Sequence, residues 1–151
     1  MQYELTTPCT AADLAPLKAG DTVLLSGVVY TARDQAHRRM LEALDKGEKL
    51  PFDLEGSAIY YVGPTPERPG EVIGSAGPTT SGRMDAMSPR LLDLGNKIMI
   101  GKGKRDAAVK EAVVRNGAVY LAALGGAGAL MAQSVKTLEV IAWPDLGCEA
   151  V

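Results

Sequence analysis

One local pattern recurs along this chain of 151 residues: an apolar run leads into a turn rich in Gly or Thr, and a helical pattern starts directly after it. The turns cover residues 30–34, 76–84, 101–106 and 124–129. Apolar runs of strand length that alternate with helical patterns predict an α/β or α+β layered domain. Free N–H groups and the helix dipole favour anions at a helix start, so each turn is also able to hold an anion.

The individual elements follow from the same pattern. Apolar runs predict strands at 21–30, 58–63, 97–101, 118–124 and 137–143, of which the first is expected to be buried. Helical spacing and stop signals predict helices at 35–47, 89–95 and 105–117 and a small one at 125–135. Thr31 and Asp34 have the spacing of a capping box, and Ser88 before Pro89 is expected to be an N-cap.

Length and composition indicate one globular domain over residues 1–151, with 46% hydrophobic and 23% charged residues. A net charge of −2 argues against a nucleic-acid reader. No signal peptide or membrane-length apolar stretch is visible, and Cys9 and Cys148 are too few for a multi-cysteine metal site. We therefore expect a soluble cytoplasmic protein with no metal ligands of its own and no nucleic-acid or membrane partner.

Three of the four turns carry a cation: Arg33, Arg83 and Lys102. The dipole disfavours an arginine at a helix start, so two such arginines call for a reason. A bound carboxylate supplies one, because the planar guanidinium grips it in bidentate fashion. Cations on separate turns suit a small di- or tricarboxylate.

The stretch GPTTSGR also has the glycine spacing of a phosphate loop. However, Arg83 and Met84 replace the lysine and the Ser/Thr of that motif. In GGAGALM, Met131 replaces the last glycine of a dinucleotide fingerprint. Nucleotide binding is accordingly disfavoured, and the hydroxyls of Thr79, Thr80 and Ser81 are left to cap a helix, to donate to a ligand or to act as a base.

Asp34 and His37 have the spacing of an acid–base pair one helical turn apart. Asp34 can equally complete the cap of Thr31, and His37 can simply lie on the helix face beside Arg38. A single histidine proves little by position, so the residues alone leave both interpretations open.

The segments TARDQAH, GSAGPTTSGRMD and MIGKGKR, with others in order from about residue 4 to the C-terminus, resemble the β subunit or C-terminal domain of class I fumarases (fumarate hydratases) and related tartrate dehydratases. The resemblance implies a swivelling β/β/α domain, with a mixed sheet and flanking helices. It also implies a hetero-oligomer with an α subunit, whose three cysteines hold a 4Fe-4S cluster. The reaction implied is the hydro-lyase step of the tricarboxylic acid cycle, reversible hydration of fumarate to L-malate.

The resemblance assigns roles to the turn residues. Arg33 and Arg83 are expected to bind substrate carboxylates, and Thr80 to contribute to the same site. Lys102 is expected to lie against a carboxylate or the developing charge, which makes it both a binding and a catalytic residue. Thr79 matches the position of the base that takes the C3 proton, a role that requires strong local positive charge.

Asp34 and His37 belong to the same motif, so we treat them as support for Arg33. Fumarase is favoured over tartrate dehydratase because the segments YTARDQAH, YYVGPTP and GSAGPTTSGRMD have fumarase-like sequences. A tartrate dehydratase, a related dicarboxylate hydro-lyase, or a non-catalytic anion-binding domain of the same fold stays open. The family usually continues beyond the segment that ends here at Val151, so we expect either a truncated product or a natural short form. The resemblance also implies activity only with the α subunit.

Overall fold

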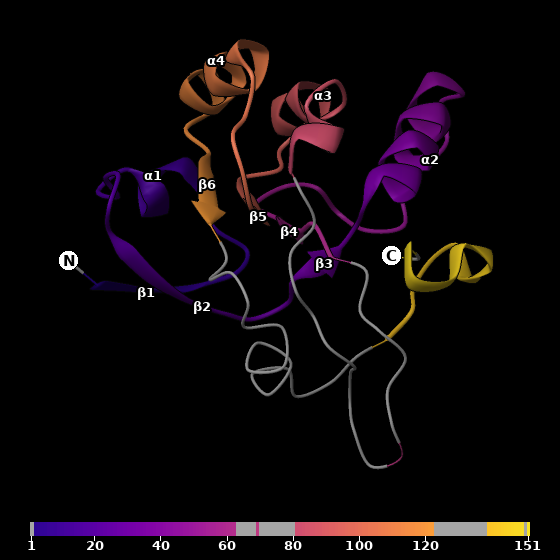
Figure 1. The fold of residues 1–151 in the computed structure, drawn as a ribbon, viewed down its shortest axis with the longest axis horizontal. Helices are drawn as coiled ribbons and strands as arrows, with labels where there is room; N and C mark the ends of the chain where they lie inside the picture. The colour runs from indigo at the N-terminus through magenta and orange to yellow at the C-terminus, as the bar shows by residue number, and fades with distance from the viewer. Residues whose placement is uncertain (1, 63–68, 70–80, 123–138, 150) are drawn as a thin grey trace.

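The computed structural model describes residues 2–62, 69, 81–122, 139–149 and 151. Its strands form two sheets (Figure 1). The smaller sheet pairs β1 (Gln2–Thr6) with β2 (Thr22–Ser26), and the larger has the order β3 (Tyr30–Thr31), β4 (Ala58–Tyr60), β5 (Ile98–Gly101), β6 (Val119–Ala122). All the described pairs are parallel, so the α/β class is confirmed, whereas the mixed sheet that we expected is not found among the described strands.

The helices that connect the larger sheet lie on one side of it. They are α2 (Asp34–Asp45), α3 (Ser88–Asp93) and α4 (Ala107–Asn116), which stand next to one another in Figure 1. The remaining helical segments are α1 (Ala11–Leu14), η1 (Ser81–Met84) and η2 (Pro144–Glu149). Parallel strands in sequential order with right-handed crossovers place every connecting helix on the same face, which explains this arrangement.

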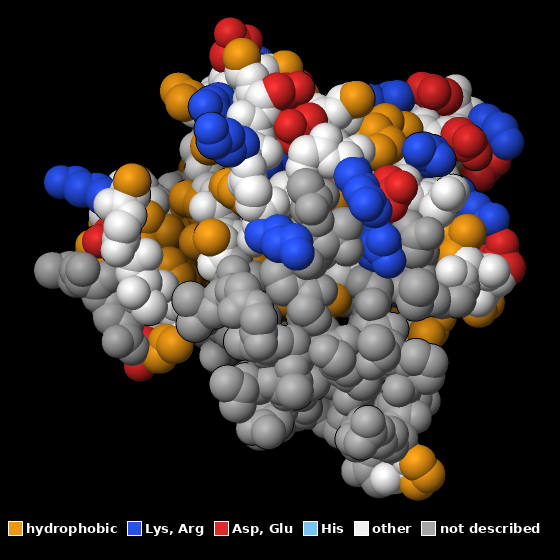
Figure 2. Space-filling model, in the orientation of Figure 1, with side chains coloured by type: hydrophobic (Ala, Val, Ile, Leu, Met, Phe, Trp, Pro, Cys, Tyr) orange, Lys and Arg blue, Asp and Glu red, His pale blue; other side chains and the backbone are white. Residues whose placement is uncertain are grey.

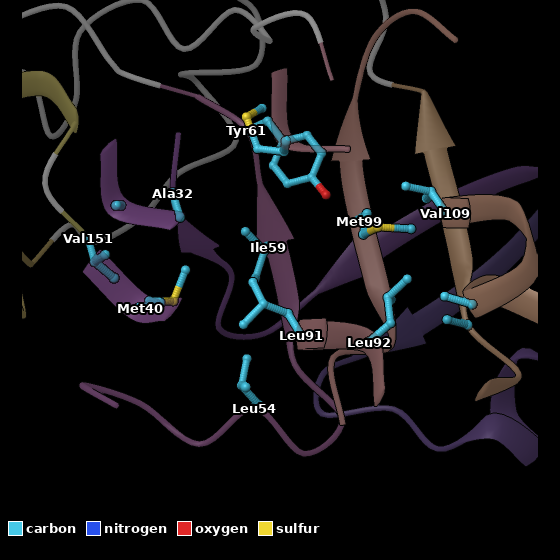
Figure 3. Close-up of a cluster of buried hydrophobic side chains, with 14 residues drawn as sticks. Ala32, Met40, Leu54, Ile59, Tyr61, Leu91, Leu92, Met99, Val109 and Val151 are labelled. Atoms are coloured by element: carbon cyan, nitrogen blue, oxygen red, sulfur yellow. The ribbon is translucent and has the colours of Figure 1, made fainter. Parts of the chain in front are cut away.

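The two faces of the larger sheet bury different clusters, because successive side chains of a strand point to opposite faces. Met99 of β5 packs in the cluster of Leu91 and Leu92 on the helix side (Figure 3). Its neighbour Ile98 packs in a second cluster, which includes Leu5 and Leu25 from the smaller sheet. Along the described residues the layers therefore run from two-stranded sheet to four-stranded sheet to helices, whereas the swivelling β/β/α domain stays a prediction.

The expected buried strand over residues 21–30 is wrong. The segment forms two short strands in different sheets, and side chains along β2 alternate between exposed and half-buried. The break lies at Gly27, whose φ of +100° suits glycine and whose added Cβ would lie 3.0 Å from the Thr7 carbonyl oxygen. Val28 beside it is 63% exposed, so an apolar run here does not mean a buried one.

The two predicted N-caps are also wrong. Thr31 lies in β3, and the N-cap of α2 is Arg33, with no side-chain cap bond. Ser88 is the first residue of α3 and its hydroxyl donates to the Met84 carbonyl oxygen, which leaves Met87 as the N-cap. The spacing from Thr31 to Asp34 satisfies the motif in sequence, but α2 begins at Asp34, two residues later than an N-cap at Thr31 requires.

The expected helix at 105–117 is confirmed, whereas the expected last strand is not. Helix α4 begins after the N-cap Asp106, which accepts from the Val109 N–H, and ends at Gly117 in the left-handed region. The last predicted strand is wrong in its described part, because residues 139–143 form no strand and lead into η2. The small helix expected at 125–135 lies outside the described residues. No helix in the described ranges is long and apolar enough to cross a membrane.

Candidate carboxylate-binding site

Two of the predicted cations follow strands of the larger sheet at the point where each strand ends. Arg33 comes two residues after the end of β3 and caps α2, where its side chain is half-buried. Lys102 follows β5 directly and is exposed. Because β3, β4 and β5 are parallel, their carboxyl ends meet at one edge of the sheet, which is where open α/β sheets bind ligands.

The third cation, Arg83, is brought to the same edge by a backbone hydrogen bond. The Ser81 N–H donates to the Lys102 carbonyl oxygen at 2.8 Å, so η1 lies against the loop of Lys102. Helix α2 also contacts η1. Arg83 itself is exposed. We call the sheet edge that carries Arg33, Arg83 and Lys102 the cation edge, and Figure 2 shows Lys and Arg side chains gathered on this face below α3.

The charges of Arg83 and Lys102 are not neutralised within the described part of the chain. There, neither side chain takes part in a hydrogen bond or an ion pair, whereas other arginines pair with aspartates. A cation that is exposed and lacks an acidic neighbour attracts anions from solution. The cation edge can therefore bind a carboxylate that does not belong to the described part of the chain, such as that of a ligand.

Beneath the cation edge lies a buried arginine that sequence reasoning missed. The Arg105 Nε donates to a carboxylate oxygen of Asp85 at 2.6 Å, and the side chain of Arg105 is only 4% exposed. Its two terminal nitrogens donate to the Tyr61 hydroxyl at 3.3 Å, and one of them also donates to the Ser88 hydroxyl at 2.9 Å. The guanidinium carbon lies 5.1 Å from the centre of the Tyr61 ring and 5.0 Å from that of Tyr120. We call Arg105, Asp85, Ser88, Tyr61 and Tyr120 the Arg105 network.

The network continues to the loop backbones. The Tyr120 hydroxyl donates to the Gly103 carbonyl oxygen at 2.9 Å and lies 2.7 Å from the Ser81 hydroxyl. Since the Tyr120 hydroxyl donates its proton to this carbonyl, the Ser81 hydroxyl is the donor and the Tyr120 oxygen the acceptor in the bond between the two hydroxyls. Gly101 is in close contact with the same group, because a Cβ there would lie 2.8 Å from Tyr61 Cδ2. Packing therefore explains the first glycine of GKG without any ligand.

His37 is bound to the backbone of Arg33. Its own N–H donates to the Arg33 carbonyl oxygen at 2.9 Å, and Nδ1 lies 2.8 Å from the same oxygen, which can only accept. Burial lowers the pKa of His37 to about 4, so the ring is neutral at pH 7 and carries its proton on Nδ1. The ring also meets that of Tyr61 edge-on, with centroids 5.4 Å apart. The placement agrees with the predicted support of Arg33, although the role stays a prediction.

The remaining predicted residues divide into two groups. Asp34 is the first residue of α2, where a negative charge suits the helix dipole. Thr79 and Thr80 lie outside the described residues. The missed residues Asp85 and Arg105 stand inside the motifs SGRMD and GKGKR, next to the cations that drew attention. Their opposite charges were the available signal, but a pairing across 20 residues cannot be inferred from spacing.

The described residues contain no group of three or more His, Cys, Asp or Glu side chains that could hold a metal ion. Cys9 packs among apolar residues between the sheets, and its thiol donates to the Thr6 carbonyl oxygen at 3.4 Å. Burial raises the pKa of the Cys9 thiol, which favours the protonated form over the thiolate that binds metals. The thiol of Cys9 does not fit the role of a cluster ligand.

Comparison of the whole sequence decides the family. The sequence model described as Fumarase C-terminus matches residues 1–151. The chain belongs to the fumarase C-terminus family. The resemblance that the motifs indicated is confirmed at this level.

Relatives of this fumarase C-terminus chain carry two kinds of name. The aerobic class I fumarate hydratase of Escherichia coli strain K12 is 39% identical over 142 residues, which are 93% of this chain and 26% of the relative. Fumarate hydratase 2 of Leishmania major is 40% identical over 144 residues, 91% of this chain and 25% of the relative. The L(+)-tartrate dehydratase subunit beta of E. coli K12 is 34% identical over 150 residues, 97% of this chain and 73% of the relative. The chain thus spans about a quarter of the length of the two fumarate hydratases.

Proposed function

We propose that this chain is the β part of a dicarboxylate hydro-lyase that catalyses the reversible hydration of fumarate to L-malate together with an α subunit. The observation that carries the proposal is the cation edge. Two exposed cations and one half-buried cation stand where parallel strands end, on segments joined by backbone hydrogen bonds. The fumarate hydratases among the relatives, and the subunit beta of a tartrate dehydratase, support the reaction class.

The cations supply binding and orientation. In this proposal Arg33 and Arg83 hold the two carboxylates of the substrate from different segments, so that its carbon chain lies along the sheet edge. Lys102, on the loop bonded to the turn of Arg83, is placed to balance charge that develops on a carboxylate as the C3 proton leaves. Binding both ends of a small dianion fixes the reacting carbons, which is where much of the rate gain of positioning comes from.

Thr79 is proposed as the base for the C3 proton, with Thr80 in the same site. A threonine hydroxyl gives up its own proton only when positive charge stabilises the oxyanion. Arg83 lies four residues after Thr79, and Lys102 is on the loop to which Ser81 is bonded. In this proposal the positive charges of Arg83 and Lys102 stabilise the Thr79 oxyanion.

The family resemblance implies a 4Fe-4S cluster, which the proposal assigns to the α subunit. Cys9 does not fit as a ligand, because its thiol is buried between the sheets and bonded to a carbonyl oxygen. In this proposal the tasks of this chain are to bind, orient and deprotonate the substrate.

The test is to reconstitute the chain with a cluster-bearing, three-cysteine α subunit under anaerobic conditions and to monitor the reaction by the absorbance of fumarate. We expect fumarate to be consumed, with L-malate as the product. No hydration by a complex that has formed and carries its cluster would contradict the proposal and favour a non-catalytic anion-binding domain.

Arg83→Ala in that complex tests the role of a single cation. We expect kcat/KM to fall about 10- to 100-fold, the value of a charged hydrogen bond to a carboxylate, with little change in stability because Arg83 is exposed. Arg38→Ala is the matched control, since Arg38 is also exposed and lies outside the cation edge on α2. Unfolding by Arg83→Ala would instead make Arg83 a structural residue.

Tartrate is the second candidate substrate, since the relative that is most completely covered among those compared is a tartrate dehydratase subunit beta. The same reconstituted complex separates the two. Faster dehydration of L(+)-tartrate than of L-malate, as kcat/KM, would reverse the preference.

A further inference from the structure

Arg105 is buried to an unusual degree for an ion-paired arginine of this chain. Its side chain is 4% exposed and that of its partner Asp85 is 13% exposed. In three other ion pairs, Arg39–Asp145, Arg90–Asp45 and Arg115–Asp93, the side chains are between 36% and 68% exposed. A charge so far from water carries a desolvation penalty, which calls for a function beyond simple attraction.

The sequence positions of the pair point to that function. Arg105 stands three residues after Lys102, and Asp85 stands two residues after Arg83. One carboxylate oxygen of Asp85 accepts from Arg105, and the other accepts from the Asp106 N–H at 2.9 Å. Both oxygens of Asp85 are therefore held by the segment that carries Lys102, and a third bond, from Ser81 to the Lys102 carbonyl oxygen, ties the two segments together above them.

The other sides of the guanidinium are also occupied. Its two terminal nitrogens donate to Ser88, Tyr61 and the Met99 sulfur, and the rings of Tyr61 and Tyr120 lie about equally far from its central carbon. Tyr120 in turn donates to the Gly103 carbonyl oxygen, one residue beyond Lys102. Only a planar fork with several donors satisfies this set, so lysine cannot replace arginine here.

We propose that Arg105 is a positioning residue, which through Asp85, Tyr61 and Tyr120 fixes the loop of Lys102 against the turn of Arg83 so that both cations face one substrate. Apolar residues often replace a buried ion pair without loss of stability, so the pair is better explained by the geometry that it imposes. The inference rests on the proposed function for its kinetic part, whereas the geometric part concerns this chain alone.

The experiment uses the reconstituted complex with Arg105→Lys and Arg105→Met. The first keeps the charge and loses the fork, and the second keeps an unbranched chain to about the position of Nε and loses the charged group. Arg115→Lys is the matched control, because Arg115 pairs with Asp93 at the far end of α4. Four quantities are measured: kcat and KM per folded complex, the inhibition constant of succinate (a four-carbon dicarboxylate with no double bond or hydroxyl), and hydrogen exchange of the Ser81 amide.

Positioning predicts a specific combination of results for Arg105→Lys. We expect KM and the inhibition constant of succinate to rise and kcat/KM to fall about 100-fold, the cost of misplacing a binding group by about an ångström. The Ser81 amide should exchange at least about tenfold faster, since its bond to Lys102 is no longer held in place. Arg115→Lys should leave all four quantities unchanged.

A purely structural role gives a different combination. Loss of folded complex lowers the apparent kcat but leaves KM, the succinate constant and Ser81 exchange in the folded fraction as in the parent, and that result would overturn the inference. If the parent complex has no hydro-lyase activity, the proposed function fails, while Ser81 exchange in the same three variants still decides the geometric part. Parent-like exchange in both Arg105 variants would refute it.

Discussion

Two arginine–aspartate pairs stand at opposite ends of α4, and they differ in almost every respect but composition. Arg115, in the last turn, meets Asp93 through three contacts of 2.8 to 3.0 Å, and both side chains are about half exposed. Arg105, just before the helix, makes a single 2.6 Å contact to Asp85 and is buried. The pair with the more complete geometry lies in water, where a salt bridge is worth little.

The comparison shows that position determines what such a pair can do. Arg115 and Asp93 join the exposed ends of α4 and α3, and the loss of either leaves its partner in solvent. Arg105 and Asp85 join two segments of the cation edge, and the loss of either leaves an uncompensated charge inside the protein. The buried pair therefore constrains geometry strongly, although its net contribution to stability is small.

The largest expected effect is the loss of stability when the buried Arg105–Asp85 pair is broken. Arg105→Met alone should lower the free energy of unfolding by about 3–5 kcal/mol, because Asp85 is left buried and unpaired. Denaturant unfolding of the folded chain at pH 7 measures the change. A loss below about 1 kcal/mol would mean that water reaches Asp85 and that the two pairs are alike.

The double variant Arg105→Met with Asp85→Leu supplies the control. Removing both charges should recover most of the lost stability, since the penalty belongs to the unpaired charge. Activity should not recover with it, because Met and Leu do not reproduce the bonds to Ser88 and Asp106. Recovery of both would show that packing alone sets the geometry of the cation edge.

A fall in pH should lower the free energy of unfolding through His37, whose buried ring contacts Tyr61 of the Arg105 network. Burial lowers the pKa of His37 from 6.5 to about 4, so between these values the unfolded chain binds a proton that the folded chain does not. Stability should therefore fall as the pH drops from about 6.5 to 4, by about 3 kcal/mol from this group, and should not change for this reason above 6.5.

His37→Gln isolates that contribution. Carboxylates also titrate near pH 4, so the relevant quantity is the difference in unfolding free energy between the parent and the variant across the range. The difference should shrink as the pH falls. A constant difference would mean that the ring is hydrated and that the buried side responds to acid no more than the exposed one.

Gly101→Ala probes the packing of the same network with a single methyl group. The new Cβ would lie 2.8 Å from Tyr61 Cδ2 and would also meet the Ser81 side chain, so one of them has to move. We expect a loss of about 1–3 kcal/mol, typical of overpacking in a core. Thermal unfolding measures it, and Gly82→Ala is the matched control, since φ is not positive at either glycine and a Cβ at Gly82 comes no closer than 3.9 Å, to the Lys104 carbonyl oxygen.

Some of this molecule could be predicted from its sequence and some could not, for physical reasons. Helix α4 was predictable because its N-cap, periodicity and C-terminal glycine are local signals. Residues 21–30 were not, because an apolar run does not show that Gly27 divides it between two sheets. The cations Arg33 and Lys102 could be predicted to share an edge from the turn pattern alone, whereas the Arg105–Asp85 pair depends on how distant segments pack.

The smallest effect is expected at the exposed pair. Arg115→Ala should lower the free energy of unfolding by at most about 1 kcal/mol, in spite of its three contacts to Asp93, because both partners are solvated and the pair loses side-chain entropy when it forms. Hydrogen bonds from Asn116, the largest cause, and from Arg115 lower the pKa of Asp93, so part of the carboxylate's stabilisation survives the substitution.

Unfolding at 0.05 M and 1 M NaCl measures what the charge of Arg115 contributes, and the effect of Arg115→Ala should vanish at the higher salt. A loss that rivals that of Arg105→Met and persists in salt would show that the geometry of the contacts, and not burial, sets the strength of an ion pair in this fold.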